Sequence, residues 1–233
     1  MTALVWDATG EHFYETGVDH GVLYIPTEGQ YTKGVAWNGL TGVTESPSGA
    51  ESNPQYADNI KYLNLISAEE WAGTIEAFTY PDEFAACNGE KELADGVTVG
   101  QQSRSTFGMS YRTKIGNDTD GSDHAYKIHL LYGLTAAPSE KAYATVNDSP
   151  EAVTFSWEAS SVPVNVTGML PTSSITIDSR TADPTKLTAL EKILYGAEEV
   201  EPRLPLPDEV KTLMTGAKAA SVDIQQPSAK LAV

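Results

Sequence analysis

Two histidines and a group of aspartates in the middle of the chain are the residues best suited to binding a metal ion. His124 and His129 are the only close histidine pair. If this segment is a strand, a separation of five residues places the two rings on opposite faces, so they cannot hold one ion between them. We therefore interpret both as solvated strand histidines and predict no metal site here.

The neighbouring acidic residues superficially resemble a calcium-binding loop, with the pattern Asp118, Asp120, Gly121 and Asp123. When Asp120 and Gly121 are placed at the fifth and sixth positions of an EF-hand loop, the first position falls on Gly116 and the twelfth on Lys127. Neither residue carries a carboxylate, so both key ligands are missing. A polar hairpin turn explains the same residues, and a weak calcium site of another kind is the alternative.

The sequence contains none of the common catalytic patterns: no Gly-x-Ser-x-Gly elbow, no glycine-rich phosphate loop and no His-Glu-x-x-His. The single cysteine, Cys87, has no second thiol for a disulfide or a paired zinc site, and we predict that it is a buried structural thiol. We accordingly predict a protein that is not an enzyme and has no catalytic residues, metal or cofactor. An enzyme of β-sandwich form is an alternative.

Four tryptophans, Trp6, Trp37, Trp71 and Trp157, offer a different chemistry, because exposed indole rings can form a platform for sugars. Trp37 and Trp157 lie in segments with strand-like alternation, where packing in a core or between subunits is the ordinary role. Sugar binding by exposed tryptophans is the less common role, so we keep a monomeric β-sandwich module that binds glycans as the alternative function.

The charge balance argues against binding to nucleic acid. The chain has 233 residues and a formal net charge of -17; residues 1 to 100 hold 16 acids and 3 bases, and the remainder hold 16 acids and 12 bases. Sequence-independent binding to DNA needs clustered lysine and arginine. An acidic conduit through which DNA slides is compatible with this charge, because such a lining would prevent sticking.

Alternating apolar and polar residues from position 33 onward predict a mainly β protein. The clearest strand runs from Phe107 to Ile115, with Phe107, Met109 and Tyr111 on the core face and Ser110 on the wet face. A second runs from Tyr126 to Leu134, with Leu134 on the same face as Tyr126, and the turn-rich segment between the two strands predicts a hairpin. We expect further strands near Val35 and Trp37 and at 60–66, 74–80, 153–159, 162–166 and 175–177.

Helical signals are few. Asp183 is a suitable N-cap, Pro184 suits the first helical position, and Gly196 can end the helix. Leu187, Leu190, Ile193 and Leu194 form one apolar stripe, so this helix should cover the sheet. Pro81 to Cys87 is expected to form a short helical turn, and another short helix is expected from Asp208.

Between the strands near Trp37 and Ile60 lies a polar segment that lacks apolar periodicity. We predict it to be a long loop, and loops of this length are usually functional or disordered. The whole chain is then predicted to contain an N-terminal arm at 1–21, one β domain at 22–196 and a C-terminal arm at 197–233. We find no signal peptide and no membrane span, so we expect folding in a cytoplasm.

Two runs of sequence resemble the major tail tube proteins of long-tailed, non-contractile bacteriophages. They are Gly34-Val35-Ala36-Trp37-Asn38-Gly39-Leu40-Thr41-Gly42-Val43-Thr44-Glu45-Ser46-Pro47-Ser48-Gly49 and Tyr56-Ala57-Asp58-Asn59-Ile60-Lys61-Tyr62. The segment Glu69 to Gly89, the hairpin from Phe107 to Leu134 and the strand from Val153 to Ala159 are similar to the same family in order and spacing. The resemblance covers roughly Val18 to Gly196.

The resemblance implies a β-sandwich or half-barrel tail tube fold with one flanking helix, a long stacking loop and extended terminal arms. It implies a virion structural protein that self-assembles into stacked hexameric rings, which form the tube for genome delivery. The stacking loop would reach the next ring. Its residues are Thr44, Glu45, Ser46, Pro47, Ser48, Gly49, Glu51, Asn53, Pro54 and Tyr56.

The same resemblance predicts the partners. They are other copies of this chain, the tape measure protein, and the tail tip and tail terminator proteins. DNA would be a partner only in passage, without sequence-specific binding, and no membrane partner is expected. The protein would be found in the tail of the virion, after assembly in the host cytoplasm.

Overall fold

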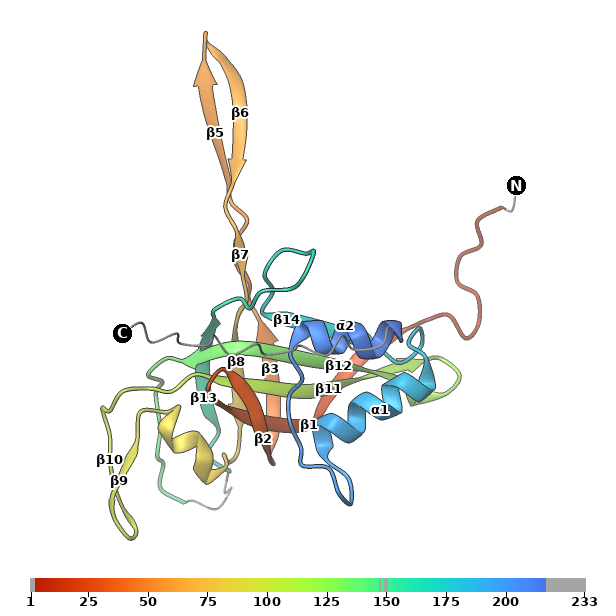
Figure 1. The fold of residues 1–233 in the computed structure, drawn as a ribbon. Coiled ribbons are helices and arrows are strands. Elements are labelled where there is room, and N and C mark those ends of the chain that lie inside the picture. The colour runs from red at the N-terminus through yellow and green to blue at the C-terminus, as the bar shows by residue number, and fades with distance from the viewer. Residues whose placement is uncertain (1–2, 147, 149–150, 217–233) are drawn as a thin grey trace, which may run out of the picture.

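The computed structural model describes residues 3–146, 148 and 151–216. Strands make up 48% of the structure and helices 12%, which confirms the predicted mainly β fold. Figure 1 shows a sheet-based body from which one long hairpin projects. The strands of the main sheet are β1 Tyr14–Thr27, β2 Gln30–Ala36, β3 Leu40–Glu45, β8 Ala72–Ala77, β11 Phe107–Asn117, β12 Gly121–Ala136, β13 Phe155–Ser161 and β14 Ser174–Asp178.

The main sheet is antiparallel and strongly curved. Its strand order is β2-β1-β11-β12-β13-β8-β3, and β14 pairs with a second stretch of β12. The curvature brings the start of β3 back to β1: Leu40 packs against Gly21, and the Trp37 amide donates to the Gly21 carbonyl at 2.8 Å. The body is therefore a half-barrel whose two ends approach each other.

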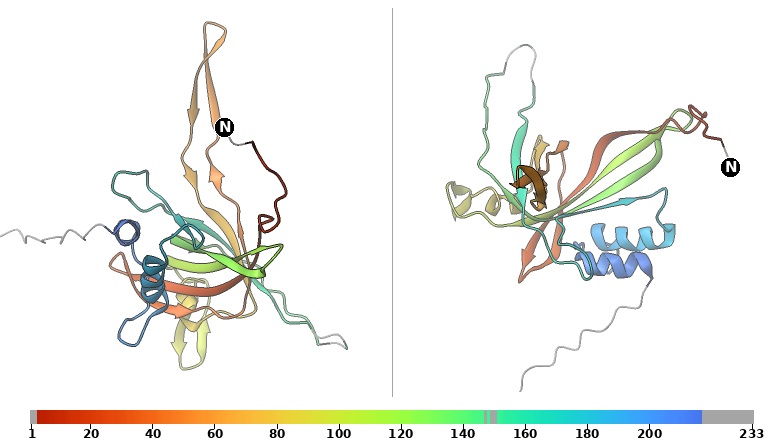
Figure 2. Two further views of the ribbon diagram at one scale, coloured as in Figure 1. Left: turned by 90° about the vertical axis from the view of Figure 1, so that its right-hand side faces the viewer. Right: turned by 90° about the horizontal axis from the view of Figure 1, so that it is seen from above.

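Two apolar cores lie on opposite faces of β1, β11 and β12. The first, between these strands and the β13-β8-β3 half of the sheet, is rich in aromatic rings and contains Leu23, Trp37, Phe84, Met109 and Trp157. The second lies beneath helices α1 (Pro184–Tyr195) and α2 (Pro207–Thr215), which lie on the other face of the sheet in both views of Figure 2. It contains Tyr24, Leu130, Tyr132, Leu190 and Leu194.

The second core corrects our expectation that β11 and β12 each have one dry and one wet face. Ser110, predicted to be wet, is fully buried, because the helices cover that side of the sheet. Leu134 also leaves the face on which we placed it. Gly133 has a φ of +61° and forms a bulge between Met109↔Leu131 and Phe107↔Leu134, which turns Leu134 toward the aromatic core.

The helices follow the predicted sequence signals. The Asp183 carboxylate accepts from the amides of Thr185 and Lys186, and Leu187, Leu190 and Leu194 are buried, which confirms the capped helix that covers the sheet. The short helix expected from Asp208 is α2. The expected turn after Pro81 is a 3-10 helix, η1 Asp82–Ala86, followed by a small hairpin of β9 Lys91–Ala94 and β10 Val97–Val99.

Three segments differ from the sequence expectation. The N-terminal arm predicted at 1–21 contains the first half of β1, which begins at Tyr14 and pairs with β11. Part of the predicted C-terminal arm is packed on the body, since Pro202 accepts from the Gly34 amide and Leu204 bridges to Tyr31. The strand expected at 162–166 is absent from the described chain apart from one bridge, Val164 to Thr172. Residues 217–233 lie outside the described residues.

Candidate assembly surface

The prediction of a loop after Thr44 is wrong. The chain continues from β3 into a two-stranded hairpin and then returns to β8. Nearest the body is a short stalk, formed by β4 Ser48–Gly49 and β7 Glu69–Glu70. Beyond it, β5 Ser52–Ala57 pairs with β6 Ile60–Ile66, and we call this pair the ribbon. Figure 1 shows the ribbon extending away from the body. Apolar periodicity failed to reveal it because β5 is polar.

The turn of the ribbon has a clear local cause. Ala57 pairs with Ile60, so only Asp58 and Asn59 form the connection. Both have positive φ, 50° and 63°, as a type I′ turn requires, and its twist matches that of a hairpin. The turn chemistry therefore fixes the register of a hairpin that has no other support.

All seven residues of β6 are exposed, although most of them are apolar. Large apolar side chains of the ribbon are exposed to extents from 40% for Leu63 to 71% for Tyr56. Asp58 and Lys61 are the only charged residues between positions 52 and 66. A two-stranded hairpin is marginally stable in water, and an exposed apolar patch marks an interaction site. The ribbon is thus a surface built to be covered.

Both faces of the ribbon carry apolar groups. From Tyr62 to Ile66 the side chains alternate, so Tyr62 and Ile66 share one face, while Leu63 and Leu65 share the other. Tyr56 follows Gln55, which pairs with Leu63, so Tyr56 lies on the Tyr62 face, beside a shift in register. A partner that covers only one face would leave several of these side chains in water. The ribbon is therefore suited to lie between two surfaces.

The structure places the predicted stacking residues together, but in three different settings. Thr44 and Glu45 end β3, and Ser46 and Pro47 lead into the stalk, which holds Ser48 and Gly49. Glu51 lies between stalk and ribbon; Asn53, Pro54 and Tyr56 belong to β5. The predicted stacking residues leave out β6, which carries most of the exposed apolar groups, although its strand was predicted at 60–66. The signal for including it was the apolar run that follows the Asp-Asn turn.

The root of the hairpin is fixed to the sheet by side chains. Tyr111 in β11 donates its hydroxyl hydrogen to the Glu45 carboxylate at 2.6 Å, and the ring of His129 in β12 stacks on Tyr111 with ring centroids 4.6 Å apart. On the other strand, the Ser161 hydroxyl donates to the Trp71 carbonyl at 2.9 Å. The hairpin thus leaves the body from a defined position.

Gly49 is required by the geometry of the stalk. Its φ is +87°, and a Cβ placed there would lie 2.1 Å from the carbonyl oxygen of Ala68 in the facing strand. We expect Gly49→Val to open the stalk at a cost on the order of 1–3 kcal/mol and to reduce self-assembly at least about tenfold, while the melting temperature of the body stays unchanged. Sedimentation of assembled particles measures the first effect and circular dichroism the second.

Gly96→Val is the matched control. Gly96 also has a positive φ, +74°, in the β9–β10 turn, but nothing lies within 4 Å of the added Cβ. It should assemble normally. Equal assembly of the two variants would contradict the role we give to the stalk.

His129 should make the stability of the hairpin root depend on pH. Burial lowers the pKa of His129 below 6.5, against the opposing effect of Glu45. Because the folded-state pKa is the lower one, the unfolded chain takes up the proton first, so stability is complete above about pH 6.5 and decreases below it. We expect His129→Phe, which keeps a ring against Tyr111, to flatten this decrease between about pH 7 and 5. Urea unfolding at several pH values measures the slope, and an unchanged slope would contradict the assignment.

Strand edges provide a second kind of assembly surface. Within the described chain, β3 pairs only with β8 and β14 only with β12. Each therefore presents one edge to which another strand can be added. The outer edge of β2, by contrast, is occupied by residues 202–204.

The residues considered for metal binding are each engaged elsewhere. His124 bonds to Asp120 at 2.8 Å, Asp123 binds Lys114 at 2.9 Å, and Asp118 accepts from the Gly10 amide at 2.9 Å. In the described ranges no group of three or more histidine, cysteine, aspartate or glutamate residues is placed to hold an ion. The expectation of a solvated His129 is wrong, because Tyr111 and Thr113 cover its ring.

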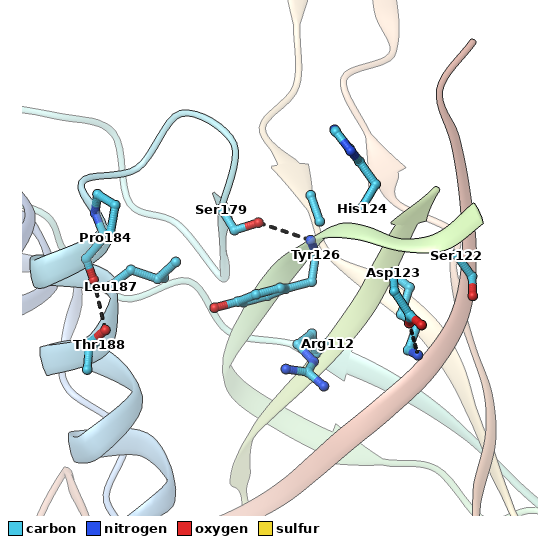
Figure 3. A pocket seen from close by; sticks show the side chains of 11 residues that line it. Arg112, Ser122, Asp123, His124, Tyr126, Ser179, Pro184, Leu187 and Thr188 are labelled. Carbon is cyan, nitrogen blue, oxygen red and sulfur yellow. Dashed lines mark hydrogen bonds and ion pairs between the residues drawn. The ribbon is translucent and has the colours of Figure 1, made fainter. Parts of the chain in front are cut away.

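A cavity of about 430 Å³ lies between the outer ends of β11 and β12 and the start of α1 (Figure 3). Its polar side chains bind one another or their neighbours: the Ser179 hydroxyl accepts from the Tyr126 amide, and the Arg112 guanidinium binds Asp19 at 2.8 Å. Among the described residues, neither Ser122 nor Ser179 bonds to His124. The cavity therefore lacks a nucleophile paired with a base, and its contacts join α1 to the sheet.

Three of the four tryptophans are buried: Trp37, Trp71 and Trp157. Trp6 is exposed, but it cannot form a multi-ring platform alone, so the structure does not favour the glycan-binding alternative. Cys87 is fully buried, as predicted, and burial raises the pKa of its thiol to about 12. The thiol is therefore inert at neutral pH.

The sequence matches no protein-family model and no curated protein. No helix in the described part of the chain is both long and apolar enough to cross a bilayer.

Proposed function

We propose that this protein is the structural subunit of a phage tail tube, which self-assembles into stacked hexameric rings around a conduit for DNA. The observation that carries the proposal is the ribbon, an apolar hairpin that leaves the β domain and packs against nothing else among the described residues. A segment of this kind needs other subunits to cover it, and identical subunits are the simplest source.

The two kinds of surface support two kinds of contact. Unpaired edges at β3 and β14 suit lateral contacts, and closing subunits into a ring removes such edges. The ribbon extends beyond the body and suits a contact with the next ring along an axis. A heterologous contact that does not close on itself builds an open filament. Rings joined in this way would form a tube.

The charge supports a conduit. Most of the excess negative charge belongs to residues 1 to 100, which include the hairpin and the small β9–β10 hairpin. Repulsion between carboxylates and phosphates would let DNA pass without binding. Tape measure, tail tip and tail terminator proteins are the further partners that this function requires.

Negative-stain electron microscopy of the purified protein, with light-scattering mass measured over a concentration series, tests the proposal. We expect hollow tubes or rings of uniform width, with a mass that is a multiple of the 25.0 kDa subunit. A monomer at every concentration, even with tail-tip components added, would overturn the proposal. In that case, binding of glycans followed by tryptophan fluorescence would test the alternative function directly.

A further inference from the structure

The N-terminal segment presents a second apolar element that its own chain leaves uncovered. Leu4, Val5 and Trp6 are consecutive, and each is exposed by at least 74%. They precede β1 and belong to no helix or strand. Three adjacent apolar residues of this size in water are typical of an anchor for a partner.

The base of this segment is fixed, which determines where the anchor can go. The Gly10 amide donates to Asp118 at 2.9 Å, and the Asn117 side chain donates to the Gly10 carbonyl at 3.2 Å. The Phe13 ring packs on His124 with ring centroids 5.4 Å apart. These contacts hold the segment at the β11–β12 turn, and from there it runs away from the body (Figure 1). Its apolar residues therefore lie away from their own domain.

A groove of matching chemistry lies on the body between α2, β14 and the loop at 166–170. It has a volume of about 540 Å³ and is lined mainly by apolar side chains, among them Met169, Leu170, Ile175, Val210 and Met214. Met169 and Leu170 are highly exposed at its rim. Methionine side chains adapt to the shape of a ligand, so the groove suits an irregular apolar anchor.

The groove is held in place by polar contacts at one end. The Asp208 carboxylate accepts from the Thr167 amide at 2.9 Å and from its hydroxyl at 2.7 Å, and the Lys211 ammonium donates to the Thr167 carbonyl at 2.8 Å. Within the described residues, Lys211 has no carboxylate at ion-pair distance. Together with the hydrogen bonds from Thr167, this ammonium lowers the pKa of the Asp208 carboxyl, so its charge is partly balanced within the rim. The rim still presents an ammonium that attracts an acidic residue.

We propose that residues 4–6 of one copy dock into this groove on a second copy, with Trp6 as the buried anchor and Asp7 beside Lys211. The carboxylate of Asp7 is 93% exposed and lies 3.8 Å from the His12 ring. Its charge is complementary to the ammonium at the rim, which favours this segment as the occupant. The ribbon is a poorer occupant, because it is two strands wide and has no acidic residue next to its apolar side chains except at its turn. This inference rests on the proposed function, and it adds a contact between subunits that is separate from the ribbon.

Quenching of tryptophan fluorescence by iodide tests the docking, because Trp6 is the one tryptophan in the described structure that solvent reaches freely. Assembled particles should lose at least about half of the quenching seen in the dilute monomer. The charge-inserting double variant Met169→Glu/Leu170→Glu should restore it. Both residues are exposed, so the fold should be unaffected. Leu93→Glu places a charge at an exposed apolar site on the β9–β10 hairpin and is the matched control.

Two results would overturn the docking: Trp6 quenched fully in assembled particles, or Trp6 protected equally in the groove variant. Neither quenching result would contradict the proposed tube function. Disulfide formation between Trp6→Cys and Leu170→Cys supplies a readout that needs no tubes, since the native Cys87 is buried. Cross-linked dimers without tubes would support the docking and overturn the tube function. Tubes without cross-linking would support the tube function and overturn the docking. If neither tubes nor cross-linked dimers formed, both proposals would be overturned.

Discussion

Removal of residues 51–67, with Ala50 joined to Ala68 by an Asn-Gly turn, is expected to give a folded protein that forms no long tubes. The deleted segment contributes nothing to either apolar core, so the melting temperature of the body should stay within a few degrees of the intact protein. Burial of each large apolar side chain contributes roughly 1.5–3 kcal/mol. Loss of several such groups exceeds the roughly 8 kcal/mol of a micromolar contact. Electron microscopy and light scattering would show the loss of assembly.

Single substitutions sharpen this prediction by testing the two faces of the ribbon separately. Tyr62→Asp charges one face and Leu65→Asp the other, and each should reduce assembly at least about tenfold if both faces are covered. Leu93→Asp makes the same type of change on another exposed hairpin and should assemble normally. If long tubes formed from the deletion variant, the ribbon would not be the contact between rings. If only one of the two point variants failed, the ribbon would be covered on one face.

Trp157→Ala is expected to lower the free energy of unfolding by about 3–5 kcal/mol, the usual cost of removing a large buried aromatic ring. The indole of Trp157 packs edge-on against Trp37, Tyr80 and Phe84, with ring centroids 5.2 to 5.6 Å apart. Its ring nitrogen donates to the side chain of Asn88 at 3.2 Å. Trp157 therefore connects three parts of the chain: β13, the residue that follows β2, and the helix η1. A loss of this size is a large part of the 5–15 kcal/mol by which domains are stable.

Guanidinium unfolding followed by circular dichroism would measure the effect. Trp157→Phe keeps most of the ring volume and loses the bond to Asn88, so we expect a smaller cost of about 1–2 kcal/mol. A cost below about 1 kcal/mol for Trp157→Ala would show that the aromatic core is not what holds the two halves of the curved sheet together.

Local signals in the sequence were sufficient where each element depends on its nearest neighbours along the chain. Alternation predicted β11 and β12, turn residues predicted the hairpin between them, and Asp183, Pro184 and Gly196 predicted the limits of α1. These signals are local because capping bonds, turns and side-chain alternation involve residues only a few positions apart.

Only the tertiary structure decided which surfaces are covered. Ser110 is buried because α1 and α2, distant in sequence, lie over that face of β11. Leu134 changes face because of the bulge at Gly133, where a Cβ would lie 2.3 Å from the Val162 carbonyl oxygen. The segment after Thr44, predicted to be a loop, is a hairpin because β5 pairs with β6. The sequence pattern did not predict β5, because β5 has no apolar alternation. The amino-acid sequence by itself determined a mainly β protein with an acidic surface and one capped helix. Long-range contacts, whose energies depend on residues far apart in the chain, determined where the hairpin leaves the body, the groove beside α2 and the position of the base of the N-terminal segment.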